Sequence, residues 1–198
     1  MLKKILLFLS IVILTSCSDF LEVDLPKDQL TKDLVFRDDN LARSTMAGVY
    51  RSLETSGFLF GGYSGSGVLL GCYSDELIAY NTSSSEFQIY NMDINTRSTM
   101  VKSLWQTSFN QLYSINSILD GLNNSPNITL NVKKQLTGEA LFLRALIHIY
   151  LGGVYGRIPY VTSISYEVNQ SISSQNFVSI LSFSRKDVED ALLLLPEN

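Results

Sequence analysis

The chain has 198 residues and a formal net charge of −4 at pH 7, a length sufficient for one domain with a substantial core. No basic patch or stripe occurs along it, which excludes nucleic acid as a partner because phosphate binding requires one. Only two cysteines occur, Cys17 and Cys72, and this number and spacing exclude a disulfide framework and a CxxC metal or redox site.

Residues 1–16 have the three parts of an export signal. Two lysines precede an apolar run of ten residues, Ile5 to Leu14, about half of the roughly 20 that a helix needs to span a bilayer. The following Leu14-Thr15-Ser16-Cys17 resembles a lipobox. We therefore predict that residues 1–16 are a lipoprotein signal peptide and that acyl chains on Cys17 anchor the chain to a membrane from outside. The alternative is an ordinary secretory signal with a coincidental cysteine.

Residues 17–39 are predicted to be a lipidated tether. They show no helical period, and Pro26 and scattered charges indicate an extended segment. A helical domain is predicted to occupy residues 40–198.

The first helix is expected from Asp39 to near Gly57, because apolar positions recur at four-residue steps behind possible N-caps at residues 38–40. Six of the twelve glycines then lie between Gly57 and Gly71. They lack the spacing and the Lys-Ser/Thr ending of a phosphate loop, so we interpret this stretch as a flexible loop rather than a nucleotide site.

Two longer helices are predicted from Val101 to Leu122 and from Asn131 to Val154, separated by a turn. Trp105 and Glu139, which lie 34 residues apart on these helices, match the period of a tetratricopeptide unit. Since one such pair cannot bury its apolar face alone, a third helix from Phe177 to Leu195 is expected to pack on it.

Several residues of types that often occur in functional sites are interpreted as structural. Trp105 lies on the apolar stripe of its helix and is expected to pack in the core. Glu139 and Arg144 are expected to form pairs within or between helices. His148 lies in an apolar run, which favours a hydrogen-bonded core histidine over a metal ligand, and a zinc site is not predicted. Cys72 is expected to be a buried small hydrophobe.

Several short motifs occur in a fixed order along the chain. They are the following runs: Cys17-Ser18-Asp19-Phe20-Leu21-Glu22-Val23-Asp24, Ala47-Gly48-Val49-Tyr50, Ser74-Asp75-Glu76, Trp105 with Tyr113, Asn116, Ile118 and Leu119, Gly138-Glu139-Ala140-Leu141-Phe142-Leu143-Arg144-Ala145, Tyr155-Gly156-Arg157-Ile158-Pro159-Tyr160-Val161-Thr162, and Asp187-Val188-Glu189-Asp190-Ala191 through Leu195-Pro196. In this order they resemble the SusD/RagB family of outer-membrane nutrient-uptake lipoproteins of Bacteroidetes. Together they cover the chain from the lipobox to its last residues.

The resemblance implies an all-α, tetratricopeptide-like repeat scaffold with long irregular loops. It implies a surface-exposed lipoprotein of the outer membrane that captures oligosaccharide and hands it to a SusC-like TonB-dependent channel, with no enzymatic activity and no cofactor. Acidic residues behind Cys17 resemble the surface-export signal of this group, or are a merely solvated leader. Because family members are considerably longer, we expect the helical domain to be incomplete at its C-terminus.

Three other functions stay open at this stage. One is a peptide-capturing RagB-like uptake protein, and another is a helical scaffold that binds no nutrient. The third is a surface glycosidase, which needs two carboxylates facing each other across a cleft. Asp75 and Glu76 are adjacent in the sequence and would diverge, which disfavours a glycosidase.

Candidate ligand-binding residues lie in the polar stretch after Ser74-Asp75-Glu76. Glycan capture needs flat apolar faces for the C–H surfaces of sugar rings, together with amide and guanidinium donors for the hydroxyls. The residues of the stretch that offer these groups are Tyr80, Asn81, Phe87, Tyr90, Asn91 and Arg97. A loop aromatic that only covers the core is the alternative for each aromatic member.

Overall fold

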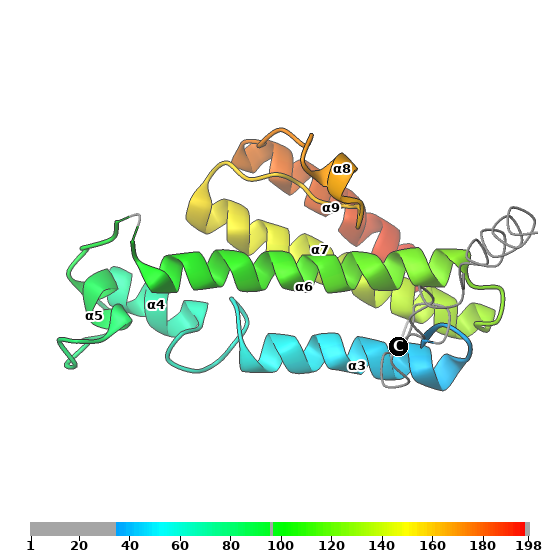
Figure 1. Ribbon diagram of the computed structural model, residues 1–198, viewed down its shortest axis with the longest axis horizontal. Helices are drawn as coiled ribbons and strands as arrows, with labels where there is room; N and C mark the ends of the chain where they lie inside the picture. The colour runs from blue at the N-terminus through cyan, green and yellow to red at the C-terminus, as the bar shows by residue number, and fades with distance from the viewer. Residues whose placement is uncertain (1–34, 96, 197–198) are drawn as a thin grey trace, which may run out of the picture. The chain divides into compact units, whose positions relative to one another are not determined.

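A computed structural model describes residues 35–95 and 97–196, all of which belong to one unit of the chain, Lys32–Asn198. The signal peptide, Cys17 and most of the predicted tether lie outside the described residues. The helices, labelled as in Figure 1, are α3 (Asp39–Thr55), α4 (Ser66–Tyr73), α5 (Ser85–Tyr90), α6 (Thr99–Asn124), α7 (Leu130–Tyr155), α8 (Tyr166–Asn169) and α9 (Phe177–Leu194). The described part of the chain contains no strand, only an isolated bridge between Ile158 and Gln175.

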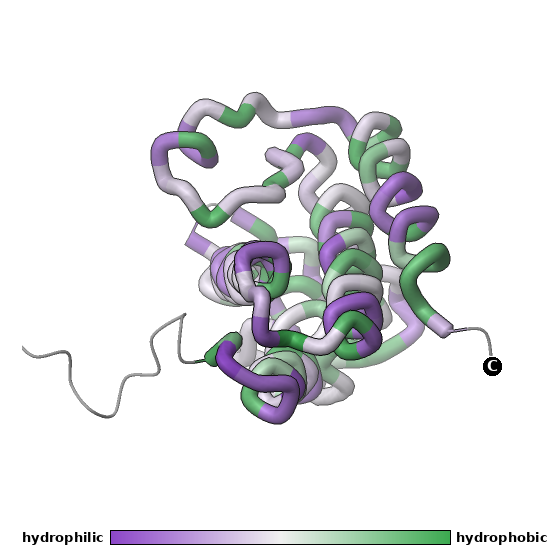
Figure 2. The backbone as a smooth tube through the Cα atoms, turned by 90° about the vertical axis from the view of Figure 1, so that its right-hand side faces the viewer, coloured by the Kyte–Doolittle hydropathy of each residue, from purple (hydrophilic) through white to green (hydrophobic). Residues whose placement is uncertain are grey.

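The four long helices pack side by side: α6 contacts α3 and α7, α9 contacts α7, and α3 also contacts α7 (Figure 1). Helices α6 and α7 are antiparallel, since the Tyr155 hydroxyl at the end of α7 donates to the carbonyl of Val101 near the start of α6. In Figure 2 short hydrophobic and hydrophilic stretches follow one another along the long helices, as expected where each turn carries both apolar and polar residues. The predicted all-α, tetratricopeptide-like scaffold with long irregular loops is therefore confirmed.

Small residues bring α7 and α9 close together. Gly138, Ala145 and Gly152 recur every seven residues on α7 and are all buried. A Cβ atom on Gly138 would lie 2.8 Å from the Leu195 side chain, and one on Gly152 would lie 2.9 Å from the Phe177 ring. The two ends of α9 therefore meet opposite ends of α7, in an antiparallel pair whose spacing depends on these small residues.

The first helix is fixed at both ends. The Asp38 carboxylate accepts hydrogen bonds from the backbone N–H groups of Asn40 and Leu41, as an N-cap does. At the other end the side-chain amide of Gln111, on α6, donates to the carbonyl oxygens of Ser52 and Ser56 at 3.2 Å. Since the last carbonyls of a helix have no partner within it, Gln111 couples the end of α3 to α6.

The predicted glycine-rich loop ends earlier than expected. Residues 57–65 form the loop, but α4 begins at Ser66 and continues through Gly71, which the sequence assigned to the loop. The apolar side chains of α4 explain the difference, because Leu69 and Cys72 are buried in the core. That burial outweighs the cost of roughly 1 kcal/mol for each helical glycine.

The four long helices agree with the predicted positions, whereas the short helices α5 and α8 were not predicted. Helix α3 starts at Asp39, α6 and α7 extend the two predicted central helices by a few residues, and α9 starts at Phe177. None of the helices in the described ranges is both long and apolar enough to cross a membrane.

Candidate functional site

Two hollows lie on two different faces of α4. Leu69, Leu70 and Tyr73 face one of them, and Val68 and Cys72 face the other. A helix that is apolar on every side is normally buried in a core. Two sides of α4 form pocket walls, and its residues Leu69 and Cys72 also pack in the core, which accounts for its apolar character on every side.

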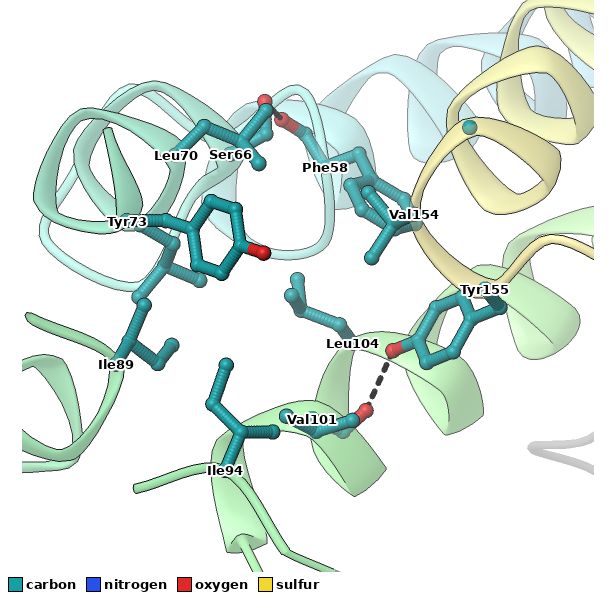
Figure 3. Close-up of a pocket in the computed structure, with 12 residues that line it drawn as sticks. Phe58, Ser66, Leu70, Tyr73, Ile89, Ile94, Val101, Leu104, Val154 and Tyr155 are labelled. Carbon is teal, nitrogen blue, oxygen red and sulfur yellow. Dashed lines mark hydrogen bonds between the residues drawn. The ribbon is translucent and has the colours of Figure 1, made fainter. Parts of the chain in front are cut away.

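The first hollow, the apolar pocket, has a volume of about 360 Å³ (Figure 3). Residues from α4, α5, the start of α6, the adjacent end of α7 and the nearby loops line it: Phe58, Ser66, Leu69, Leu70, Tyr73, Ile89, Ile94, Val101, Leu104, Gly153, Val154 and Tyr155. The Ser66 hydroxyl donates to the carbonyl of Phe58 at 2.6 Å, and burial raises the pKa of Tyr155 to about 12. The pocket thus offers an apolar lining with few polar groups.

The second hollow, the open pocket, has a volume of about 530 Å³ and a more varied lining. Its walls are Tyr63, Val68, Cys72, Leu77, Ile78, Ala79, Tyr80, Asn81, Ser84 and Glu86. Two of the aromatic side chains stand in solvent, since Tyr63 is 71% exposed and Tyr80 is 85% exposed. Large exposed aromatic surface is typical of a binding site.

The structure brings together two of the six predicted ligand-binding residues, Tyr80 and Asn81, which both line the open pocket. The Asn81 side-chain oxygen accepts the backbone N–H of Ser83 at 3.1 Å, which holds the amide in place. Its NH₂ group takes part in no hydrogen bond within the described residues. Two stacking or donor groups of the kind that sugar binding needs therefore meet in one pocket.

The other four predicted residues line neither pocket. On α5 the rings of Phe87 and Tyr90 contact each other with centroids 6.4 Å apart, and Tyr90 packs against the core. Asn91 donates its side-chain amide to the carbonyl of Phe87 at 2.9 Å. Arg97 is exposed, and its backbone N–H donates to the side chain of Asn95. Their roles as ligand-binding residues stay predictions.

Eight of the ten residues that line the open pocket are missing from the predicted set, among them the second aromatic residue, Tyr63, and the one carboxylate, Glu86. Tyr63 lies in the glycine-rich loop, where an aromatic residue between glycines was interpreted only as part of a flexible segment. Glu86 lies in the first turn of α5, a short helix that the sequence pattern did not predict. A tyrosine within a run of glycines is a sequence signal that could have identified Tyr63.

Glu86 gives the open pocket a negative charge. Burial raises the pKa of the Cys72 thiol, and the nearby Glu86 carboxylate raises that pKa further. Glu86 forms no hydrogen bond or ion pair with another side chain or backbone group of the described chain. Its carboxylate is therefore available to a ligand. Cys72 is buried, as predicted.

The other singled-out residues take structural roles. Trp105 is partly buried against the core and meets the Tyr155 ring edge-on at 5.0 Å between centroids. Glu139 and Arg144 pair across helices, as expected, but with other partners than each other. Glu139 accepts the Tyr50 hydroxyl at 3.1 Å, and Arg144 binds Asp187.

His148 is the predicted hydrogen-bonded core histidine. Its Nε2 accepts the backbone N–H of Val161 at 3.0 Å, so the ring proton resides on Nδ1 and is donated to the carbonyl of Arg144 at 2.8 Å. Burial lowers the pKa of His148 to about 4, with the positive charge of Arg144 acting in the same direction. Within the described ranges, no three His, Cys, Asp or Glu side chains are grouped so that they could hold a metal ion.

Comparisons with known proteins point to one family. Residues 19–198 match a SusD-like family described as "starch-binding associating with outer membrane". No curated protein matches the chain at a significant level.

Solved structures with a similar fold include a SusD homolog from Bacteroides thetaiotaomicron (TM-score 0.71, 19% identity), which aligns with 86% of this chain and 32% of its own. A SusD superfamily protein from Bacteroides vulgatus gives a TM-score of 0.68 at 21% identity, over 82% of this chain and 36% of its own. A SusD-like carbohydrate-binding protein from Bacteroides fragilis gives 0.65 at 20% identity, over 82% of this chain and 33% of its own. The chain therefore spans about a third of the length of these relatives.

Proposed function

Because the chain belongs to the SusD-like family, we propose that it is a surface-exposed lipoprotein of the outer membrane that captures oligosaccharide nutrients and hands them to a SusC-like TonB-dependent channel. The description of the family, starch-binding and associated with the outer membrane, supports the ligand class and the location. The solved relative from Bacteroides fragilis is likewise described as carbohydrate-binding.

The observation that carries the proposal is the open pocket beside α4. Tyr80 presents a ring that is 85% exposed at the wall of the pocket, where it offers an aromatic face to the C–H surface of a sugar ring. Asn81 and Glu86 supply a donor and an acceptor for sugar hydroxyls on the same wall. Apolar stacking with a few polar groups is the general pattern of a small-ligand site.

The membrane attachment in this proposal depends on residues 1–39. The signal peptide would be removed before Cys17, and acyl chains on that cysteine would hold the helical domain of residues 40–198 outside the membrane. The tether of residues 17–39 would give the domain reach over the channel. The predicted division of function is thus attachment in the N-terminal segment and capture in the helical unit.

An array of immobilised glycans and peptides, probed with the fluorescently labelled protein, tests the ligand class. Binding to glycans with no release of cleaved product is the expected result. Release of shorter sugars would instead indicate a glycosidase, and binding to peptides alone would indicate a peptide-capturing RagB-like protein. Binding to neither class would leave a helical scaffold.

A further inference from the structure

All charged side chains in the segment that forms the open pocket are acidic. No lysine or arginine occurs between Arg51 and Arg97, and every residue of the pocket wall lies within that interval. The same interval contains five carboxylates: Glu54, Asp75, Glu76, Glu86 and Asp93. A ligand in this pocket therefore meets a negative electrostatic field with no cation on the pocket wall to balance it.

Glu86 is the member of this set that faces the ligand. It lines the pocket together with Tyr80 and Asn81, and its charge raises the pKa of the Cys72 thiol, which lines the same pocket from α4. Since no hydrogen bond or ion pair within the described residues engages its side chain, a bound molecule meets the carboxylate directly. Asp75 and Glu76 are exposed in the turn that leads into the pocket residues Leu77 and Ile78.

A carboxylate has opposite effects on two classes of sugar. It accepts strong, charge-assisted hydrogen bonds from the hydroxyl groups of a neutral sugar. It repels the carboxylate of a uronic acid, and no cation on the pocket wall offsets that repulsion. Tyr63 and Tyr80 do not offset this effect, because an aromatic face is itself electronegative.

We infer that the open pocket selects uncharged glycans over uronate-bearing glycans and that Glu86 is the specificity-determining residue. This inference rests on the proposed function, since it presupposes that glycans bind in the open pocket. It adds the chemical class of the ligand and the side chain that enforces it.

Two variants with the same change of charge test the inference. Glu86→Gln removes the pocket carboxylate but keeps a hydrogen-bonding side chain of the same size. Glu189→Gln is the matched control, because Glu189 is an exposed residue on α9 that pairs with Arg185 and lines neither pocket. Affinities of each protein for the best neutral and the best uronate-bearing member of the glycan array are measured by titration calorimetry.

The wild-type protein is expected to bind the neutral glycan in preference. Glu86→Gln is expected to raise the affinity for the uronate-bearing glycan, relative to the neutral one, by about tenfold, whereas Glu189→Gln leaves the ratio unchanged. Raising the ionic strength from about 0.05 M to about 0.5 M is expected to reduce the preference of the wild-type protein for the neutral glycan, since salt screens the repulsion between Glu86 and the uronate.

Three results distinguish failure of this inference from failure of the proposed function. Equal affinity of the wild type for both glycans overturns the inference and leaves glycan capture intact. An unchanged ratio in Glu86→Gln, with the wild-type preference present, overturns the role of Glu86. Absence of binding to every glycan contradicts the proposed function itself.

Discussion

Arg144 and Asp187 form a two-pronged ion pair between α7 and α9, in which Nε and Nη2 of Arg144 each donate to one carboxylate oxygen of Asp187 at 2.7 Å. Both side chains are about nine-tenths buried. The Tyr160 hydroxyl donates to the same carboxylate at 2.7 Å, and Nη1 of Arg144 donates to Asn116 on α6 at 3.1 Å. One buried network therefore connects three helices and the segment that follows α7.

Removing one partner of this pair is expected to destabilise the protein strongly. Arg144→Met leaves the buried Asp187 carboxylate without its cation, which costs about 3 to 5 kcal/mol of unfolding free energy. Urea unfolding followed by circular dichroism measures the loss. The control is Arg185→Met, which breaks the exposed pair with Glu189 and is expected to leave the unfolding free energy nearly unchanged. Similar losses in the two variants would contradict the structural role of the network.

Stability is expected to fall as the pH decreases through the range from about 6.5 to about 4. Burial lowers the pKa of His148 to about 4 in the folded state, whereas the unfolded chain binds the same proton near 6.5. In that window the unfolded state holds more protons, so acidification favours unfolding, by about 2 kcal/mol between about pH 7 and about pH 5. His148 is the only histidine of the chain, which makes the effect attributable to one residue.

The variant His148→Gln provides the comparison for this pH dependence. It cannot be protonated, so its unfolding free energy is expected to stay nearly constant from about pH 7 to about pH 5, although it is lower throughout because the bond to Val161 is altered. An equally steep decline in the variant would show that other groups cause the pH dependence.

Gly121 is expected to be intolerant of even one added methyl group. A Cβ atom at this position on α6 would lie 2.0 Å from the ring of Phe36, which is itself buried. Gly121→Ala is therefore expected to lower the unfolding free energy by about 1 to 3 kcal/mol. Gly48→Ala on α3 meets no atom within 4 Å and is expected to be neutral or stabilising by up to about 1 kcal/mol. The order of the two thermal midpoints tests the contact between Phe36 and α6.

Lipidation is expected to depend on one thiol. Cells that produce the wild-type chain in the presence of labelled palmitate are expected to yield a labelled protein in the membrane fraction. Cys17→Ala is expected to remove the label, because the thioether needs the thiol, whereas Cys72→Ala retains it since Cys72 is buried. A labelled Cys17→Ala protein, or an unlabelled wild type, would contradict the predicted anchor.

The long helices were predictable because their apolar positions repeat with the helical period. The stripes in α3, α6, α7 and α9 set their bounds to within a few residues. Helix α4 was not predictable in this way, since it is apolar on every side and contains two glycines. Its helical state depends on burial of its side chains in a core that forms only when segments distant in the sequence come together.

The sequence pattern likewise could not predict which side chains pair between helices. Arg144 was expected to pair structurally, but Asp187 lies 43 residues away on a helix whose register the periodicity does not define. In the candidate site, the need for an aromatic face and an amide donor identified Tyr80 and Asn81. Tyr63 and Glu86 were missed because their place in the pocket results from how the loop and α5 fold against α4.

The binding of glycan at Tyr80 tests the central claim most directly. Titration of a neutral oligosaccharide selected on the array is compared among the wild type, Tyr80→Ala and Tyr166→Ala. Tyr166 is the matched control, since it is 76% exposed on α8 and lines neither pocket. We predict that Tyr80→Ala weakens binding by about tenfold or more and that Tyr166→Ala leaves it unchanged. Undiminished binding in Tyr80→Ala would contradict capture of glycan in the open pocket.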